Sequence, residues 1–313
     1  MKTAFLFSGQ GSQYPAMGKE LFEAFPEKAQ EILDTANETF DFDLWSIIQN
    51  GTAEELSQTR VSQPAIFTVS LLALAAAKEK GIEFEGVAGH SLGEYAAMVA
   101  SGILSLKDGY TAIKHRAIAM DKAAKANPGA MAAIIGLSAE KVMEVCEKIK
   151  ANGDYVTAVN FNSPIQTVIA GTKEGIEKAS EAAKEAGARR AMPLAVSAAF
   201  HSELMKPAAE EFKEAVKDIS FNAPKVKFYS NVIGAELTDF SNMPELMAKH
   251  ICFPVKFTDE LNAMKNDGFD RYIELGPGKV LTGLVGKTLK EVKAVNIENL
   301  DTLNAAVSDT NPF

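Results

Sequence analysis

The chain has 313 residues, of which 47% are hydrophobic and 23% charged, so it is long enough for one large domain or for a large and a small one. Its net charge of −9 argues against broad binding of nucleic acids, and no apolar run, including AIFTVSLLALAAA at 65–77, reaches the roughly 20 residues that cross a bilayer. With no low-complexity stretch, disorder is expected only at the ends, as in the tail SDTNPF.

The start of the chain, MKTAFLFSGQGS, has a short apolar run that predicts a first strand and not a signal peptide. Cys146 and Cys252 are the only cysteines, and their separation in sequence suggests neither a disulfide framework nor a metal site. We therefore expect a cytoplasmic protein. The sequence also has no metal-ligand spacing and no phosphate-binding G-x-x-x-x-G-K motif, so we expect no bound metal or cofactor.

Apolar stretches alternate with helical patterns in the first part of the chain. TAFLFSG at 3–9 predicts a strand, a long helical region follows, GVAGHS at 86–91 predicts a second strand, and further helices run to about Ala126. This alternation predicts an α/β domain with a largely parallel sheet.

The middle of the chain, from Pro128 to Val196, has a different pattern. It predicts, in order, strand AMAAIIGL, helix SAEKVMEVCEKIKANG, strand YVTAVNFN, strand QTVIAG, helix TKEGIEKASEAAKEAG and strand ARRAMPLAV. A βαββαβ order is typical of a ferredoxin-like domain. We therefore expect a small domain at 127–196, inserted into a large domain made of 1–126 and 197–313. After Ser197 the large domain continues with strand-like KVKFYSN and RYIELG and a final helix near LTGLVGKTLK.

The segment GHSLGE at 89–94 places Ser91 between two glycines, where a predicted strand turns into a helix. Such a turn strains the backbone and exposes the hydroxyl near the helix N-terminus, where free N–H groups can stabilise an oxyanion. The Leu92 N–H would be one natural donor. Two interpretations are open at this point: Ser91 is a nucleophile, or it only caps the helix, for which serine is also preferred.

A nucleophilic serine needs a base, and the chain has four histidines. His201, in AAFHSELM, follows a strand-like segment and precedes a predicted helix, where catalytic groups of α/β proteins gather, although a surface or capping role is the alternative. His90, beside Ser91, points elsewhere on such a turn and is expected to be structural. His115 is expected at the surface of a helix.

Arg116 lies on the helical segment KDGYTAIKHRAIAMDKAA, next to an apolar stripe formed by Ile113, Ala117 and Met120. A position at the border of this stripe could bury the guanidinium, which would then need an anion such as a carboxylate. The alternative is that the arginine extends along the surface with its charged end in water.

Six motifs together resemble the malonyl-CoA:acyl carrier protein transacylases of fatty acid synthesis. They are FSGQGSQ, GHSLGEYAA, the HR pair ending at Arg116, NFNSPIQTVIAG, VSAAFHS and ELGPGKVLTGL, and they cover essentially the whole chain. The resemblance implies a hydrolase-like α/β domain with the inserted ferredoxin-like domain. It also implies a ping-pong reaction, in which malonyl passes from malonyl-CoA to a serine and then to the phosphopantetheine thiol of the holo acyl carrier protein.

The resemblance also implies a role for each matching residue. Ser91 would be the nucleophile and His201 its base, while the backbone N–H groups of Gln10 and Leu92 would form the oxyanion hole. Arg116 would bind the malonyl carboxylate.

Two further positions bear on specificity and on the base. The phenylalanine of AAFH is similar to malonyl-selective members, in which it limits room for a methyl branch. Many members have glutamine where this chain has His250, and the backbone carbonyl there orients the catalytic histidine. We therefore expect His250 to orient His201 through its C=O, with an incidental imidazole.

The family is usually monomeric, and we expect a monomer that binds neither nucleic acid nor membrane. Two other classes remain as alternatives. A serine thioesterase or esterase would share the strand, turn and helix around Ser91 but would transfer the acyl group to water. A non-catalytic scaffold that binds carrier proteins would not depend on Ser91.

Overall fold

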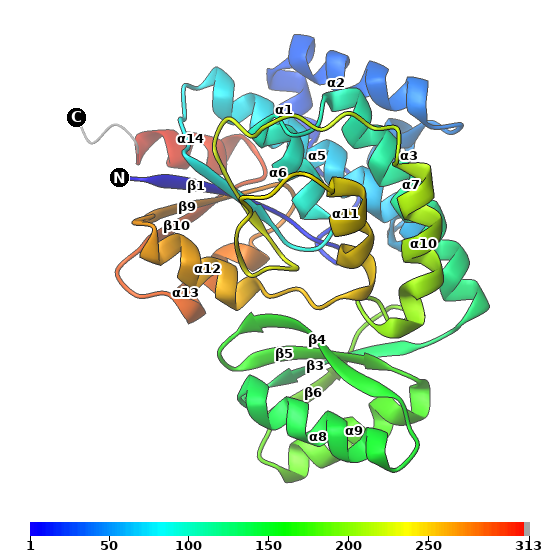
Figure 1. Ribbon diagram of the computed structural model, residues 1–313. Helices are drawn as coiled ribbons and strands as arrows, with labels where there is room; N and C mark the ends of the chain where they lie inside the picture. Colours follow the sequence, from blue (N-terminus) through cyan, green and yellow to red (C-terminus); the bar gives the residue numbers. More distant parts are fainter. Residues whose placement is uncertain (310–313) are drawn as a thin grey trace.

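Two β-sheets organise the computed structural model, which describes residues 1–309 (Figure 1). In spatial order, the strands of the larger sheet are β10 (Lys293–Ile297), β9 (Arg271–Leu275), β1 (Thr3–Phe7), β2 (Gly86–Gly89), β7 (Lys227–Ser230) and β8 (Ala235–Glu236). All neighbouring strands are parallel except β7 and β8, which are antiparallel. The prediction of a largely parallel sheet is therefore confirmed.

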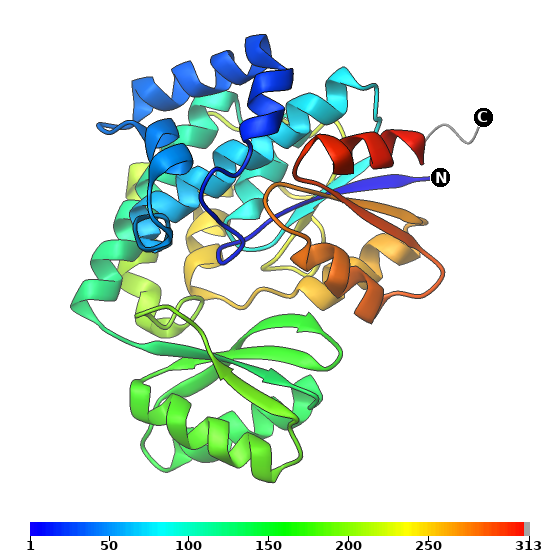
Figure 2. The same ribbon diagram turned by 180° about the vertical axis from the view of Figure 1, so that it is seen from behind.

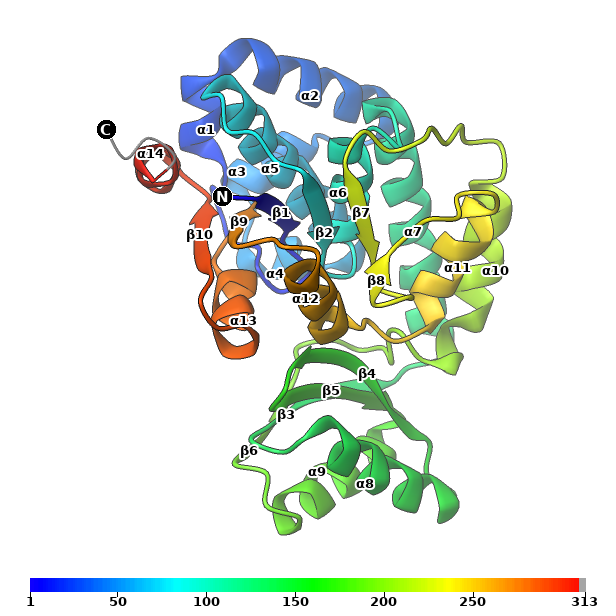
Figure 3. The same cartoon turned by 60° about the vertical axis from the view of Figure 1, so that its left-hand side comes forward.

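Strand β1 lies in the middle of this sheet and is buried on both faces. Because successive side chains of a strand point to opposite faces, Phe5 and Phe7 join one hydrophobic cluster, whereas Ala4 and Leu6 join another. The cluster around Ala4 and Leu6 includes residues of α12 (Phe257–Asn266) and α13 (Val280–Thr288). The sheet is thus the middle of three layers (Figure 3).

The other face of the large sheet packs against a thicker layer of helices. These helices are α1 (Lys19–Ala24), α2 (Pro26–Thr39), α3 (Leu44–Asn50), α4 (Ala53–Ser57), α5 (Thr59–Glu79), α6 (Gly93–Ser101), α7 (Leu106–Ala126), α10 (Lys206–Ala215), α11 (Met243–Cys252) and α14 (Leu300–Ser308). By length and composition alone α5 could span a membrane, but 89% of its most apolar window is buried inside the protein. This burial is what a core helix requires.

The smaller sheet is formed by residues from the middle of the chain. Its strands are β3 (Ala130–Ile135), β4 (Val156–Ser163), β5 (Gln166–Gly171) and β6 (Arg190–Pro193), and its helices are α8 (Ala139–Ala151) and α9 (Lys173–Glu185). The spatial order is β4-β5-β3-β6, with antiparallel neighbours throughout. The predicted succession of strands and helices is confirmed. Both helices cover one face of the sheet, and the other face is turned toward the rest of the molecule (Figures 1 and 2).

Strand β4 joins the smaller sheet to the segment that follows α11. The Val255 N–H donates to the Val159 carbonyl (2.8 Å), and the Phe161 N–H donates to the Val255 carbonyl (2.9 Å). The Thr258 hydroxyl also donates to the Phe161 carbonyl (2.9 Å). These three hydrogen bonds, each with at least one backbone group, hold β4 against the segment that leads into α12.

The sequence-based expectations are wrong at two places. The last strand of the small sheet ends at Pro193, so the strand-like segment expected to lead into His201 is irregular. The helix near LTGLVGKTLK, α13, is not the final element, because β10 and α14 follow it. Strand β10 is an edge strand with partly exposed residues, which explains its weak apolar pattern. The tail SDTNPF is expected to be disordered, but its first residue, Ser308, is the last residue of α14. Residues 310–313 lie outside the described residues.

The strands of the larger sheet bring their carboxyl ends together at one edge. In the pairing register Phe7, at the end of β1, lies opposite both Gly89 of β2 and Leu275 of β9. The loops after these strands therefore start side by side, which is where open α/β sheets bind ligands.

Gly93, the first residue of α6, offers a test of how closely α6 packs against β1. A Cβ atom there would lie 2.1 Å from the Phe7 carbonyl oxygen, which cannot move without disturbing β1. We expect Gly93→Ala to lower the free energy of unfolding by about 2 kcal/mol or more, as overpacking does. The measurement is urea denaturation followed by circular dichroism.

The matched control is Gly286→Ala on α13, where an added Cβ meets nothing within 4 Å. Because alanine favours a helix over glycine by up to about 1 kcal/mol, this variant should be as stable as the unmodified protein or more stable. Equal stability of the two variants would contradict the close approach of α6 to β1 at Gly93.

Candidate active site

The turn between β2 and α6 presents Ser91. Its φ of +52° is in the left-handed region, which costs a residue with a side chain about 1–2 kcal/mol, so the strained turn expected from the sequence is present. Gly89 and Gly93 allow it, because a Cβ on Gly89 would lie 2.1 Å from the Gly93 carbonyl carbon. The N-cap of α6 is Leu92, without a side-chain cap bond, so the interpretation of Ser91 as a capping residue is wrong.

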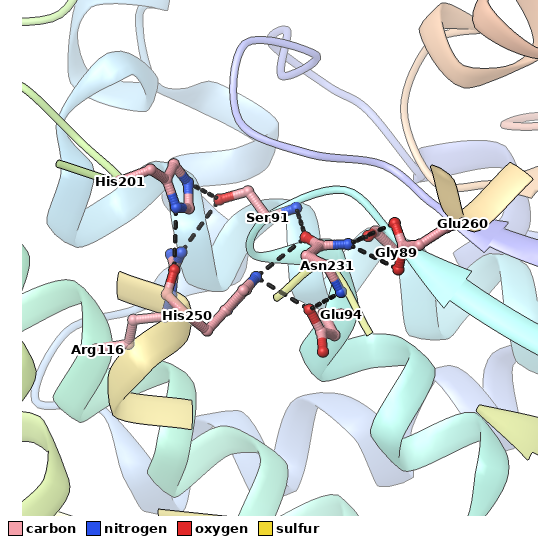
Figure 4. A network of polar contacts seen from close by, with 8 residues as sticks. All are labelled: Gly89, Ser91, Glu94, Arg116, His201, Asn231, His250 and Glu260. Carbon is pink, nitrogen blue, oxygen red and sulfur yellow. Dashed lines mark hydrogen bonds and ion pairs between the residues drawn. The ribbon is translucent and has the colours of Figure 1, made fainter. Parts of the chain in front are cut away.

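His201 lies within hydrogen-bond distance of the serine. Its Nε2 is 2.8 Å from Ser91 Oγ, and its Nδ1 is 2.9 Å from the backbone carbonyl oxygen of His250 (Figure 4). Since a carbonyl only accepts, Nδ1 carries the proton and Nε2 is free to accept from the serine hydroxyl. The predicted partners of His201 are therefore in place, and its φ of +60° is a second strained position that the sequence did not reveal.

The surroundings of His201 favour its neutral form. Burial lowers the pKa of His201 well below the ordinary 6.5, and the nearby His250 ring and Arg116 guanidinium lower it further. His201 is 3% exposed, so water does little to offset these effects. A neutral imidazole at physiological pH is the form that can take a proton from Ser91.

Arg116, on α7, is wholly buried, so the alternative of a surface arginine with its charged end in water is wrong. Its Nη2 donates to Ser91 Oγ (3.1 Å) and its Nη1 to Gln63 Oε1 (2.6 Å), while its guanidinium carbon lies 5.4 Å from the centre of the Tyr95 ring. Among residues 1–309 its Nε has no hydrogen-bond acceptor. Burial lowers the pKa of Arg116, which is opposed by Tyr95 and by the Glu94 carboxylate. A buried cation with an unused donor is suited to an anion.

A pocket of about 380 Å³ opens between the two sheets in front of Ser91. Its walls include residues from both parts of the chain, namely Gln10, Ser91, Met131, Asn160, Phe200 and His201. In the part of the chain that the structure describes, the backbone N–H groups of Gln10 and Leu92 have no acceptor. Both groups are thus available to a ligand near Ser91.

The other histidines have different surroundings. His90 Nε2 lies 2.7 Å from Asn162 Oδ1, and the His90 ring packs edge-on against Phe257, as expected of a structural residue. His115 is partly exposed on α7. His250 is 2% exposed, and its imidazole Nε2 lies 3.0 Å from both Asn231 Oδ1 and Glu94 Oε2 (Figure 4).

Sequence reasoning missed the buried polar residues around the turn, namely Gln63, Glu94, Asn231 and Glu260. Weak signals were present for two of them. Glu94 belongs to the GHSLGE segment itself, and Asn231 directly follows the strand-like KVKFYS, at the end of a strand where functional polar residues collect. No pattern marked the other two, because each lies on a helix and is buried only by the tertiary fold.

Comparisons with known proteins give a consistent result. A family model described as "Acyl transferase domain" matches residues 4–306. The chain is 45% identical to the malonyl CoA-acyl carrier protein transacylase of Bacillus subtilis (strain 168), over 98% of this chain and 96% of the relative. The crystal structure of a malonyl CoA-acyl carrier protein transacylase from Clostridium perfringens superposes with a TM-score of 0.94 at 36% identity, covering 100% of this chain and 98% of the other.

A second solved structure includes a partner protein. It is the complex of a holo type II PKS acyl-carrier protein with its malonyl-transacylase, and it matches this chain with a TM-score of 0.94 at 36% identity. The match covers 99% of this chain and 100% of the other.

The environment of His201 predicts the pH dependence of Ser91 reactivity. A base must be neutral to act, so a pKa below 6.5 moves the acidic limb of the profile to lower pH. We expect the second-order rate of Ser91 labelling by a fluorophosphonate to be half-maximal below pH 6.5. His201→Ala should label slowly at every pH, and Ser91→Ala should not label. A midpoint above pH 6.5 in the unmodified protein would contradict the surroundings described for His201.

Proposed function

Since the chain belongs to the family of acyl transferase domains, we propose that it transfers a malonyl group from malonyl-CoA to the phosphopantetheine thiol of an acyl carrier protein. One observation carries the malonyl assignment. The nucleophile candidate Ser91 touches a buried guanidinium, with 3.1 Å between Ser91 Oγ and Arg116 Nη2. An acyl group bound to this oxygen lies beside a cation. The site therefore favours an acyl group that carries its own carboxylate.

In the first half of the reaction His201 Nε2 takes the proton of the Ser91 hydroxyl as Oγ attacks the thioester carbonyl carbon. The carbonyl oxygen becomes an oxyanion and accepts hydrogen bonds from the Gln10 and Leu92 N–H groups. The C–S bond then breaks, and the coenzyme A thiolate takes the proton from His201. A malonyl ester on Ser91 remains.

The second half runs in the opposite sense with a different thiol. The phosphopantetheine thiol of the carrier protein gives its proton to His201 Nε2 and attacks the ester carbonyl. The C–O bond to Ser91 breaks, and Oγ regains the proton from His201. The carrier protein leaves as a malonyl thioester, and the protein returns to its starting state.

Selection of the acyl group rests on Arg116 and Phe200. In the ester, the distal carboxylate of malonyl is only two carbon–carbon bonds from the carbonyl carbon, so it folds back onto the guanidinium. An acetyl group leaves the buried cation unpaired, which costs about 3 kcal/mol or more. Phe200 is 6% exposed and lines the pocket, where its ring limits space for a methyl branch on the acyl group.

We also propose a domain architecture, an oligomeric state and a cellular location. The large part, 1–126 and 197–313, is a hydrolase-like domain, and 127–196 is an inserted ferredoxin-like domain, supported by the order β4-β5-β3-β6 of its sheet. The protein acts as a monomer in the cytoplasm, without nucleic acid or membrane partners. The free thiols of Cys146 and Cys252 support a reducing compartment.

Intact mass spectrometry tests the covalent step. After incubation with malonyl-CoA we expect a mass increase of one malonyl group, located on Ser91 by peptide mapping and lost when holo acyl carrier protein is added. Ser91→Ala should remain unmodified. Rapid release of free malonate without a carrier protein would instead indicate a thioesterase, and unchanged transfer by Ser91→Ala would indicate that Ser91 is not the nucleophile.

Replacing Arg116 tests the selection of the acyl group. We expect Arg116→Ala to reduce kcat/KM for malonyl transfer by about 100-fold or more, because the carboxylate loses its partner, and to spare or raise acetyl transfer. Arg60→Ala, which removes an exposed arginine on α5, is the matched control and should change neither rate. Equal losses for malonyl and acetyl in Arg116→Ala would show that the arginine does not select the acyl group.

A further inference from the structure

Asn231 holds the backbone of the turn that carries Ser91. Its Oδ1 accepts from the Ser91 N–H (2.8 Å), and its Nδ2 donates to the Gly89 carbonyl (2.6 Å). The two bonds join the residues on both sides of His90 and thus fix the strained φ of +52° at Ser91. Asn231 itself is wholly buried, so no water replaces these contacts when one is lost.

The orientation of the Asn231 amide depends on its other neighbours. A carboxamide turned by 180° would exchange Oδ1 and Nδ2 and would place a donor against the Ser91 N–H. On one side Nδ2 donates to both carboxyl oxygens of Glu260 (2.9 and 3.1 Å). On the other side His250 Nε2 lies 3.0 Å from Oδ1 (Figure 4). The described residues include no partner for His250 Nδ1, so the ring proton is on Nε2, which donates.

The Nε2 atom of His250 also lies close to Glu94, in the first turn of α6. Glu94 is 1% exposed, and its Oε2 lies 3.0 Å from His250 Nε2 and 3.3 Å from the Asn231 N–H. A buried carboxylate needs donors such as the Asn231 N–H, because it has no water to solvate it. His250 therefore links the last turn of α11 to the start of α6 and to the residue after β7.

The backbone of the same α11 turn fixes the base. The carbonyls of His250 and Ile251 accept from His201 Nδ1–H (2.9 Å) and from the His201 N–H (3.2 Å). The His250 carbonyl thereby orients His201. We propose that the His250 imidazole is a positioning group for Ser91: by donating to Asn231 Oδ1, with Glu94 Oε2 close beside it, the imidazole fixes the turn that carries Ser91. The inference rests on the proposed function of Ser91, and it replaces the expectation that the imidazole is incidental.

A set of variants tests the role of the imidazole. His250→Leu removes the Nε2–H donor at similar volume while leaving the backbone carbonyl. We expect it to slow single-turnover formation of malonyl-Ser91 by about 10- to 100-fold through misplacement of Oγ. KM for malonyl-CoA should change little, since His250 is not among the residues that line the pocket.

The conservative variant separates hydrogen bonding from packing. A glutamine amide can donate to the same acceptor, Asn231 Oδ1, so His250→Gln should regain the rate to within about fivefold of the unmodified protein, roughly the worth of one hydrogen bond. His115→Leu, on the surface of α7, is the control for loss of a histidine and should alter the rate by less than about twofold. A normal rate for folded His250→Leu, or a His250→Gln as slow as His250→Leu, would overturn the proposal.

A measurement on the unmodified protein covers the case in which His250→Leu does not fold. With ¹⁵N-labelled histidine, the His250 ring, assigned by comparison with His250→Gln, should carry its proton on Nε2. A neutral ring protonated only on Nδ1 would overturn the proposal. This readout does not depend on catalysis, so it also distinguishes the inference from the proposed function, which fails separately if the unmodified protein forms no malonyl-Ser91.

Discussion

The chemistry of the site depends on two contacts that meet at one oxygen atom. Ser91 Oγ lies 2.8 Å from the neutral His201 Nε2, to which it can donate, and 3.1 Å from Arg116 Nη2, from which it accepts. The first contact makes the hydroxyl a nucleophile, and the second places a cation where the acyl chain will lie. Activation and selection are therefore set by the position of one side chain. That position requires a strained backbone, so the surrounding structure must support it.

The charges around this oxygen are few and unevenly placed. Burial lowers the pKa of His201, and its hydrogen-bond partner, a neutral carbonyl and not a carboxylate, raises that pKa too little to offset the effect of burial. The carboxyl groups lie behind the turn instead. Burial, and then the charge of Glu94, raises the pKa of Glu260 well above its usual range, which favours the neutral form of Glu260. Glu94 then supplies the negative charge that offsets Arg116 inside the protein.

Features that depend on local pattern could be predicted from the sequence. The turn at Ser91 and the elements from β3 to β6 follow from spacing and periodicity, and the pairing of His201 with a carbonyl followed from resemblance to a family. Periodicity placed Arg116 at the border of an apolar stripe but left both a buried and a surface position open, and only the fold shows that Arg116 is buried. The rest required the fold. Asn231 and Glu260 reach the turn only because β7 and α12 pack beside β2, and β10 was missed because an exposed edge strand has little apolar pattern. The ring of His250 was judged incidental because its partners are distant in sequence.

The central claim is that the carboxylate of the acyl group lies against Arg116 while its carbonyl carbon is bound to Ser91. A crystal structure of the protein after reaction with malonyl-CoA, without carrier protein, tests this claim most directly. The account predicts density for an ester on Ser91 Oγ, with the distal carboxylate accepting from the Arg116 guanidinium and the carbonyl oxygen facing the Gln10 and Leu92 N–H groups. An ester whose carboxylate points into solvent, or an acyl group on another residue, would contradict it.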